Sequence, residues 1–273
     1  MGAKDATRKA EKKAAELVTR REGAVGWIVF SNPTRFNAMT FDMWRALPEA
    51  LAAFDADDAV RLVVLAGDGD RAFVSGADIS QFEQNRASED ARAAYNRAVE
   101  AAYLAPILCA KPVVAKVRGI CMGGGLGLAA ACDVRFCSDD AVFRMPAARL
   151  GLGYSYTGMR RFVQVLGAAN TADIFFSACK FDAQDALRMG FVRQVVPAAQ
   201  LDRAVADYAT TVGENAPLSL IAAKAAIREV LKDAGDRDLA GLQQKIDACF
   251  ASADYTEGRR AFMEKRTPDF KGR

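Results

Sequence analysis

A run of three glycines constrains the fold of this chain more than any other feature. Gly123, Gly124 and Gly125 follow the apolar run Val113–Val117 and precede small, helix-forming residues at 126–131. Because glycine has no Cβ atom, other groups can approach this backbone closely. The pattern predicts a strand, a tight turn and a helix whose unpaired N-terminal amides stabilise negative charge. Such a site suits a phosphate, or an oxygen that becomes negative during a reaction.

Strand-like and helix-like segments alternate along the first 196 residues. The predicted strands are 17–20, 25–30, 60–66, 113–117, 134–137 and 191–196, and the predicted helices are 40–54, 86–104, 126–131, 156–166, 169–179 and 183–189. Residues 73–79 are predicted to form a glycine-containing loop. This alternation indicates an α/β fold with parallel strands. No clean internal repeat is visible in the sequence.

The two ends of the chain differ from this core. Residues 1–16 are charged and alanine-rich, and residues 198–265 carry helical patterns with little strand signal. We therefore divide the chain into an N-terminal extension (1–16), an α/β core (17–200) and a helical C-terminal region (201–273).

Composition limits the possible partners. Residues 1–22 hold seven Lys and Arg against four Asp and Glu, which accounts for the net charge of +3. The balanced remainder argues against a nucleic-acid surface. No apolar run approaches the roughly 20 residues of a membrane helix, and no signal peptide is recognisable. A cytoplasmic protein without a membrane segment is therefore expected.

The absence of histidine restricts the chemistry. It removes Ser-His and Cys-His nucleophiles, histidine zinc sites and imidazole acid–base catalysis, and we expect no metal site. Proton transfer must then fall to Asp, Glu, Tyr, Lys, Cys or water. The six cysteines form no CxxC pair and are predicted to be buried, reduced thiols. Cys121 adjoins the glycines and is a possible nucleophile, although no neighbour in sequence would lower its pKa.

Several kinds of site could use the glycine turn. A P-loop is excluded because no Gly-Lys-Ser/Thr follows the glycines. Residues 125–130 fit a GxGxxA dinucleotide pattern, but Asp139 and Asp140 lie too close and the motif is in mid-chain. A structural cluster for close helix–strand packing is a further alternative. An oxyanion hole would need a second amide donor, and the glycine-containing loop at 73–79 offers one.

Four motifs, in this order and spacing, resemble the crotonase (enoyl-CoA hydratase/isomerase) superfamily over residues 17–270. They are Asn32-Pro33 with Phe36-Asn37-Ala38, the segment 72–79, Lys111–Ala115 with Gly123–Gly125 and Cys132-Asp133, and the segment 181–190. The resemblance implies a spiral of ββα repeats with a helical C-terminal trimerisation region. It also implies a homotrimer, or a hexamer made of two trimers.

The same resemblance implies acyl-CoA or enoyl-CoA substrates, with coenzyme A as part of the substrate and no permanently bound cofactor. The amides of Ala77 and Gly124 would form an oxyanion hole for the thioester enolate. Residues implied to contact coenzyme A are Arg35, Phe36, Ala38, Ser75, Ala77, Asp78, Ile79, Ser80, Gly124, Phe262 and Lys265. Ordinary solvated charge is the alternative for Arg35 and Lys265, and core packing is the alternative for Phe262.

The chain departs from its family where carboxylates are expected. The resemblance places the two hydratase glutamates at Gly127 and Ala147, and the aspartate of other branches at Ser155. None of these side chains is a carboxylate. Tyr154, Ser155 and Tyr156 are weak candidates for proton transfer, and the favoured alternative is that the tyrosines form the wall of the acyl pocket. We therefore predict a hydratase/isomerase-type enzyme, with a non-catalytic CoA-thioester-binding or assembly protein as the alternative.

Overall fold

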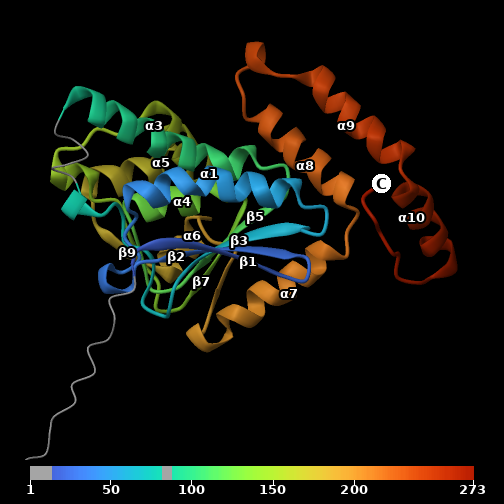
Figure 1. The fold of residues 1–273 in the computed structure, drawn as a ribbon, viewed down its shortest axis with the longest axis horizontal. Helices are drawn as coiled ribbons and strands as arrows, with labels where there is room; N and C mark the ends of the chain where they lie inside the picture. Colours follow the sequence, from blue (N-terminus) through green and yellow to red (C-terminus); the bar gives the residue numbers. More distant parts are fainter. Residues whose placement is uncertain (1–13, 82–87) are drawn as a thin grey trace, which may run out of the picture.

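Two sheets form the core of the structure (Figure 1), a computed structural model that describes residues 14–81 and 88–273. Most of the predicted extension 1–16 and the start of the predicted helix 86–104 lie outside the described residues. The larger sheet has the order β1-β2-β3-β5-β7-β10, and the smaller has the order β4-β6-β8-β9. The strands are β1 (Glu16–Glu22), β2 (Val25–Ser31), β3 (Leu62–Gly67), β4 (Ala72–Val74), β5 (Val113–Val117), β6 (Ile120–Met122), β7 (Val134–Ser138), β8 (Val142–Arg144), β9 (Lys180–Asp182) and β10 (Gln194–Val196).

Helices cover both faces of the larger sheet. The α-helices are α1 (Phe41–Ala56), α3 (Glu89–Leu108), α4 (Gly124–Ala131), α5 (Tyr156–Ser177), α6 (Ala183–Arg188), α7 (Leu201–Gly213), α8 (Pro217–Val230), α9 (Leu239–Ala251) and α10 (Ala253–Glu264). Short 3-10 turns are η1 (Pro33–Arg35), η2 (Ile79–Gln81), η3 (Ala147–Leu150), η4 (Ala198–Gln200) and η5 (Ala234–Asp236). In Figure 1, α1, α3, α4 and α5 lie above the larger sheet and α7 lies below it.

The chain winds as repeated ββα turns. In the successions β3–β4–α3, β5–β6–α4 and β7–β8–α5, the first strand joins the larger sheet and the second joins the smaller. Pairing between these successive turns is parallel in both sheets. The predicted α/β spiral is therefore confirmed, and the repeat exists in three dimensions without a visible repeat in sequence.

Local sequence explains where the helices begin. The Thr40 hydroxyl accepts the Met43 amide at 3.3 Å and so caps α1, and the helix continues through Pro48. Asp182 and Asp185 form a reciprocal capping box at the start of α6. The predicted helices 156–166 and 169–179 form one element, α5, interrupted by the non-helical backbone of Gly167.

The shortest strands were not predicted. Residues 72–74 form strand β4, so the predicted loop 73–79 is wrong at its start, and β6, β8 and β9 each have only three residues. Three residues are too few for an alternating pattern to be recognised. The predicted strand 191–196 is also shorter, since β10 covers only Gln194–Val196.

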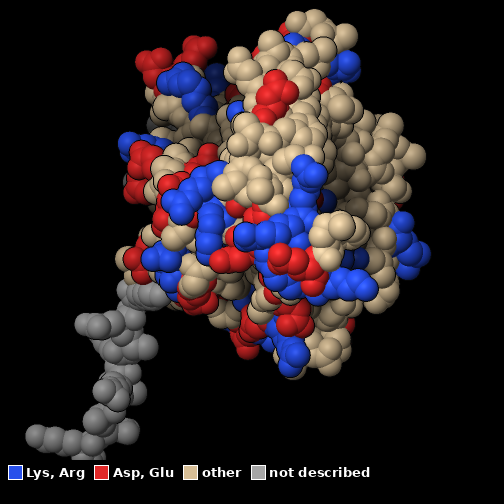
Figure 2. Space-filling model, turned by 90° about the vertical axis from the view of Figure 1, so that its right-hand side faces the viewer, with Lys and Arg blue, Asp and Glu red and all other residues tan. Residues whose placement is uncertain are grey.

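The C-terminal helices α8, α9 and α10 project beside the core rather than covering its sheets (Figure 1). Helix α9 has no buried residue in the described chain. Large apolar side chains exposed on these helices are Ile227, Val230, Leu239, Phe250, Phe262 and Met263. Figure 2 views this side of the molecule and shows uncharged surface over much of its upper half. Over the described ranges, no helix is both long and apolar enough to cross a membrane.

The glycine turn packs backbone against backbone. A Cβ atom built on Gly125 would lie 2.1 Å from the carbonyl oxygen of Val74 in β4. Because neither backbone segment can move aside cheaply, only glycine fits at this position. The first turn of α4 is thereby held directly against the end of β4.

We expect Gly125→Ala to lower the free energy of unfolding by about 3 kcal/mol, because the new methyl group overpacks this contact. Urea denaturation measures the change. Gly213→Ala is the matched control, since nothing lies within 4 Å of a Cβ atom there. Equal stability of the two variants would contradict the packing described for Gly125.

Candidate functional site

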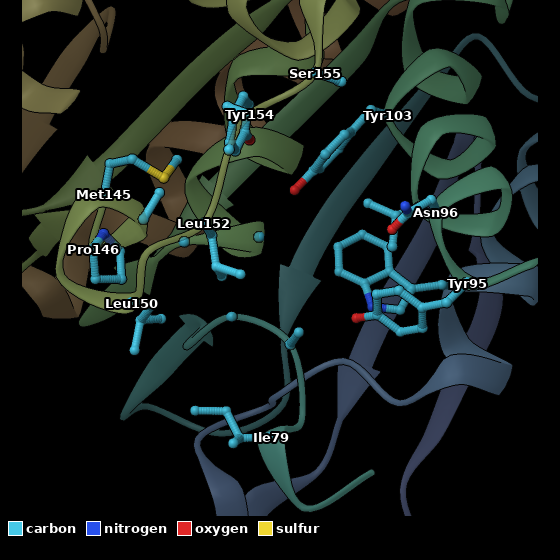
Figure 3. Close-up of a pocket in the computed structure, with 18 of the residues that line it drawn as sticks. Ile79, Tyr95, Asn96, Tyr103, Met145, Pro146, Leu150, Leu152, Tyr154 and Ser155 are labelled. Atoms are coloured by element: carbon cyan, nitrogen blue, oxygen red, sulfur yellow. The ribbon is translucent and has the colours of Figure 1, made fainter. Parts of the chain in front are cut away.

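A cavity of about 530 Å³ opens beside the glycine turn (Figure 3). Its walls come from α1, α3, the turns after β4 and β6, and the segment between β8 and α5. The described residues that line it are Trp44, Ser75, Gly76, Ala77, Ile79, Tyr95, Asn96, Val99, Glu100, Tyr103, Gly123, Gly124, Met145, Pro146, Ala147, Leu150, Leu152, Gly153, Tyr154 and Ser155. The size and the largely apolar lining suit a small organic ligand.

The amide of Gly124 lies at the N-terminus of α4. Gly123 has a φ of +51°, which glycine adopts readily, and its amide donates to the Arg144 carbonyl at 2.9 Å. Intrahelical bonding then begins at Gly127, whose amide donates to the Gly123 carbonyl. As the first helical residue, Gly124 has an amide with no intrahelical acceptor, at the positive end of the helix dipole.

The amide of Ala77 is oriented by its neighbours. The backbone of Met39 pairs with this loop through two hydrogen bonds. The Met39 amide donates to the Gly76 carbonyl at 2.8 Å, and the Met39 carbonyl accepts from the Asp78 amide at 2.8 Å. In extended backbone, successive amides point to opposite sides. The Ala77 amide therefore points away from Met39.

These two amides adjoin one another on the cavity wall. A Cβ atom built on Gly124 would lie 3.6 Å from the Ala77 nitrogen, and one built on Gly76 would lie 3.9 Å from the Gly124 nitrogen. Two fixed amides so close together can donate to a single oxygen atom, and such donors act most strongly on an oxygen that gains negative charge.

An ion-pair network supports the loop behind Ala77. The Asp78 carboxylate is only 7% exposed and accepts Arg35 Nη1 at 2.7 Å, Ser80 Oγ at 2.7 Å and the Ser80 amide at 3.1 Å. The Ser75 hydroxyl donates to the Arg35 carbonyl at 3.0 Å. The Asp78 carboxylate is thus committed to the structure of the loop.

The sequence-predicted site residues fall into three groups. Ser75, Ala77, Ile79, Gly124, Tyr154 and Ser155 line the cavity. Arg35, Phe36, Ala38, Asp78 and Ser80 form or adjoin the supporting loop without lining the cavity. Phe262, which is 82% exposed, and Lys265 lie at the end of α10, among the projecting helices. Within one chain, neither Phe262 nor Lys265 lines the cavity.

The three weak proton-transfer candidates also lie in different settings. The Tyr154 ring packs edge-on against Phe162 and Phe175, and burial raises the pKa of its hydroxyl to about 12. Ser155 Oγ accepts the Gly158 amide at 3.2 Å and so caps α5. Tyr156 is 74% exposed and does not line the cavity.

Sequence reasoning missed the walls contributed by α1 and α3. Trp44 comes from α1, and Tyr95, Val99 and Tyr103 come from one face of α3. Their spacing of four residues was a visible signal. The same spacing marks a helix face packed on a core, so it does not by itself distinguish a cavity wall.

The cysteines are mostly structural. Cys109, Cys121, Cys132 and Cys137 are buried as predicted, whereas Cys179 is exposed and Cys249 is half-buried, contrary to that prediction. Burial raises the pKa of the Cys121 thiol well above its ordinary value, with smaller contributions from Cys137 and Cys132. A thiol held neutral in this way is a poor nucleophile, which supports the packing alternative.

Comparisons with known proteins point to one family. The chain matches the sequence model described as Enoyl-CoA hydratase/isomerase over residues 20–273. It is 30% identical to the short-chain-enoyl-CoA hydratase of Clostridium acetobutylicum, with 92% of this chain and 95% of the relative covered. It is 28% identical to the peroxisomal Delta(3,5)-Delta(2,4)-dienoyl-CoA isomerase of Arabidopsis thaliana, with 94% and 97% covered.

The fold agrees as well. The crystal structure of an enoyl-CoA hydratase/carnithine racemase from Magnetospirillum magneticum superimposes with a TM-score of 0.88 at 32% identity, covering 94% of this chain and 96% of that one. The resemblance predicted from the four motifs is therefore confirmed in both sequence and fold.

We expect a thiol reagent such as iodoacetamide to label Cys179 rapidly in the native protein and to leave Cys121 unmodified until urea unfolds the chain. Peptide mass spectrometry after timed labelling identifies the sites, and Cys179→Ser should remove the fastest phase. Rapid native labelling of Cys121 would contradict the burial described above.

Proposed function

Since the chain belongs to the enoyl-CoA hydratase/isomerase family of the crotonase superfamily, we propose that it binds acyl-CoA or enoyl-CoA thioesters and stabilises their enolates with the amides of Ala77 and Gly124. The observation that carries this proposal is the adjacency of these two amides on one wall of the cavity. The relatives named above are a hydratase and an isomerase, and both reactions pass through negative charge on the thioester oxygen.

The amides act on the charge that develops during the reaction. A thioester oxygen placed between them accepts two hydrogen bonds, which strengthen as the enolate forms. Neither amide has to reorganise at that moment, because Gly124 is held by α4 and Ala77 by its neighbours' bonds to Met39. The dipole of α4 adds a partial positive charge at the same point.

The remaining predicted contacts complete the binding of coenzyme A. Ser75 and Ile79 line the cavity. Two segments joined by the Arg35–Asp78 ion pair hold the others: the segment after β2 carries Arg35, Phe36 and Ala38, and the segment after β4 carries Asp78 and Ser80. The Arg35 guanidinium is paired with Asp78, yet the Arg35 side chain is 50% exposed. It can therefore also bind a phosphate group of coenzyme A.

Phe262 and Lys265 would reach the ligand from a neighbouring copy of the chain in a homotrimer or hexamer. Two observations support such an assembly: α9 has no buried residue in the described chain, and apolar side chains are exposed along α8, α9 and α10. Surfaces of this kind normally mark protein contacts.

One observation favours the alternative function. Gly127 and Ala147, where the family resemblance places two glutamates, offer no ionisable side chain. A protein without proton-transfer groups would bind the thioester and leave it unchanged, as a binding or assembly protein would.

Three ligands distinguish the two functions. Acetoacetyl-CoA tests enolate binding by its ultraviolet spectrum, crotonyl-CoA tests hydration, and free coenzyme A controls for binding of the carrier alone. Enolate binding with turnover supports the enzyme, and binding without turnover across acyl chain lengths supports the alternative. No binding of either thioester contradicts both.

The variant pair Gly124→Pro and Gly124→Ala tests the amide directly. Both add a side chain near Trp44, but only proline removes the N–H, and proline is tolerated at the first position of a helix. We expect kcat/KM for the Pro variant to fall about 10²–10³-fold below that of the Ala variant. Circular dichroism checks that both fold. Equal activity would contradict the role of Gly124.

A further inference from the structure

The space above Gly127 is filled by a tyrosine from another helix. A Cβ atom built on Gly127 would lie 2.7 Å from Cζ of Tyr103, 2.8 Å from Cε1 and 2.8 Å from the hydroxyl oxygen. Any side chain at position 127 would therefore have to displace the Tyr103 phenol. The phenol thus occupies the place where the family resemblance expects the first glutamate.

Tyr103 is held in this place from two sides. Its ring meets that of Trp44 edge-on, with centroids 5.6 Å apart, and α4 lies beneath it at Gly127. Figure 3 shows Tyr103 and Tyr154 extending from opposite sides of the cavity, with their hydroxyl groups turned toward each other. The Tyr154 hydroxyl is shielded from solvent and has no hydrogen-bond partner among the described residues.

Tyr103 lines the same cavity as the amide pair. Gly124 and Gly127 are three residues apart on α4, so they share one face of the helix at a spacing of roughly 5–6 Å. A thioester whose oxygen sits at the Gly124 amide would therefore occupy the cavity that Tyr103 also lines.

We infer that Tyr103 is the group that transfers a proton to C2 of the bound thioester, and that Gly127 is the residue that makes room for it. This inference rests on the proposed function. It names a catalytic residue on α3, outside the positions where the family resemblance places its carboxylates.

The proton balance of the step is simple for hydration. Water adds through its oxygen to C3 of the enoyl thioester and releases one proton to solvent, while the C2–C3 double-bond pair shifts to give the enolate. The O–H bond of Tyr103 then breaks as the C2–H bond forms, and the thioester carbonyl is restored. The phenolate regains a proton from solvent water.

The electrostatics favour a donor. Burial raises the pKa of the Tyr103 hydroxyl well above its ordinary value, and the neighbouring Tyr154 and Tyr95 raise it further. At neutral pH the group is therefore a protonated phenol that can give a proton to an enolate. Among the described residues that line the cavity, Glu100 carries the only carboxylate. It lies about one helical turn before Tyr103 on α3 and accepts a hydrogen bond from the Thr157 hydroxyl at 2.9 Å.

The test is the hydration of crotonyl-CoA in D₂O, with product deuteration at C2 followed by NMR. We expect Tyr103→Phe to lower kcat about 10²–10⁴-fold, to leave binding of acetoacetyl-CoA intact, and to deuterate C2 without preference for one face. Tyr208→Phe, on α7 and packed against Phe136, is the matched control and should behave as the unsubstituted protein. Gly127→Ala should lower kcat by displacing the phenol while Tyr103 is still present.

Two outcomes overturn the inference without touching the proposed function. In one, Tyr103→Phe keeps both kcat and the facial preference, whereas Glu100→Gln loses activity. In the other, the unsubstituted protein binds acetoacetyl-CoA as the enolate but introduces no deuterium at C2. Failure to bind acetoacetyl-CoA at all would instead refute the proposed function and, with it, this inference.

Discussion

The contact between the first turn of α4 and the end of β4 is the constraint on which the site depends. Gly125 meets the Val74 carbonyl so closely that the helix N-terminus and the loop after β4 are locked together. This brings Gly124 beside Ala77 although 46 intervening positions separate them in sequence. The geometry of the amide pair is therefore set by backbone packing, before any ligand arrives.

Most of the core was predictable because its signals are local. Val113–Val117 is apolar except for Lys116 and forms β5 with the predicted ends, and Thr40 and Asp182 are cap-forming residues that lie at the starts of α1 and α6. The three-residue strands of the smaller sheet were not predictable. They exist because successive turns of the spiral place them side by side, and that information is not local.

The two walls of the candidate site differ in the same way in how far the sequence predicts them. The amide pair follows from glycines and loop positions that the sequence displays, and family resemblance pointed to the same two residues. The opposite wall could not be foreseen, because Tyr95, Val99 and Tyr103 have the spacing of an ordinary packed helix face. Only the tertiary structure shows that this face lines the cavity as well as packing on the core, and that Tyr103 lies over Gly127.

The shared space of Gly127 and Tyr103 has an evolutionary consequence. A glutamate at position 127 and a tyrosine at position 103 compete for one volume, so an ancestor with the glutamate could not acquire this tyrosine by a single substitution without a clash. The two positions are sterically coupled, so the effect of a substitution at one depends on the residue at the other. A comparison of this chain with its relatives therefore has to consider positions 127 and 103 together, because the residue at one decides what fits at the other.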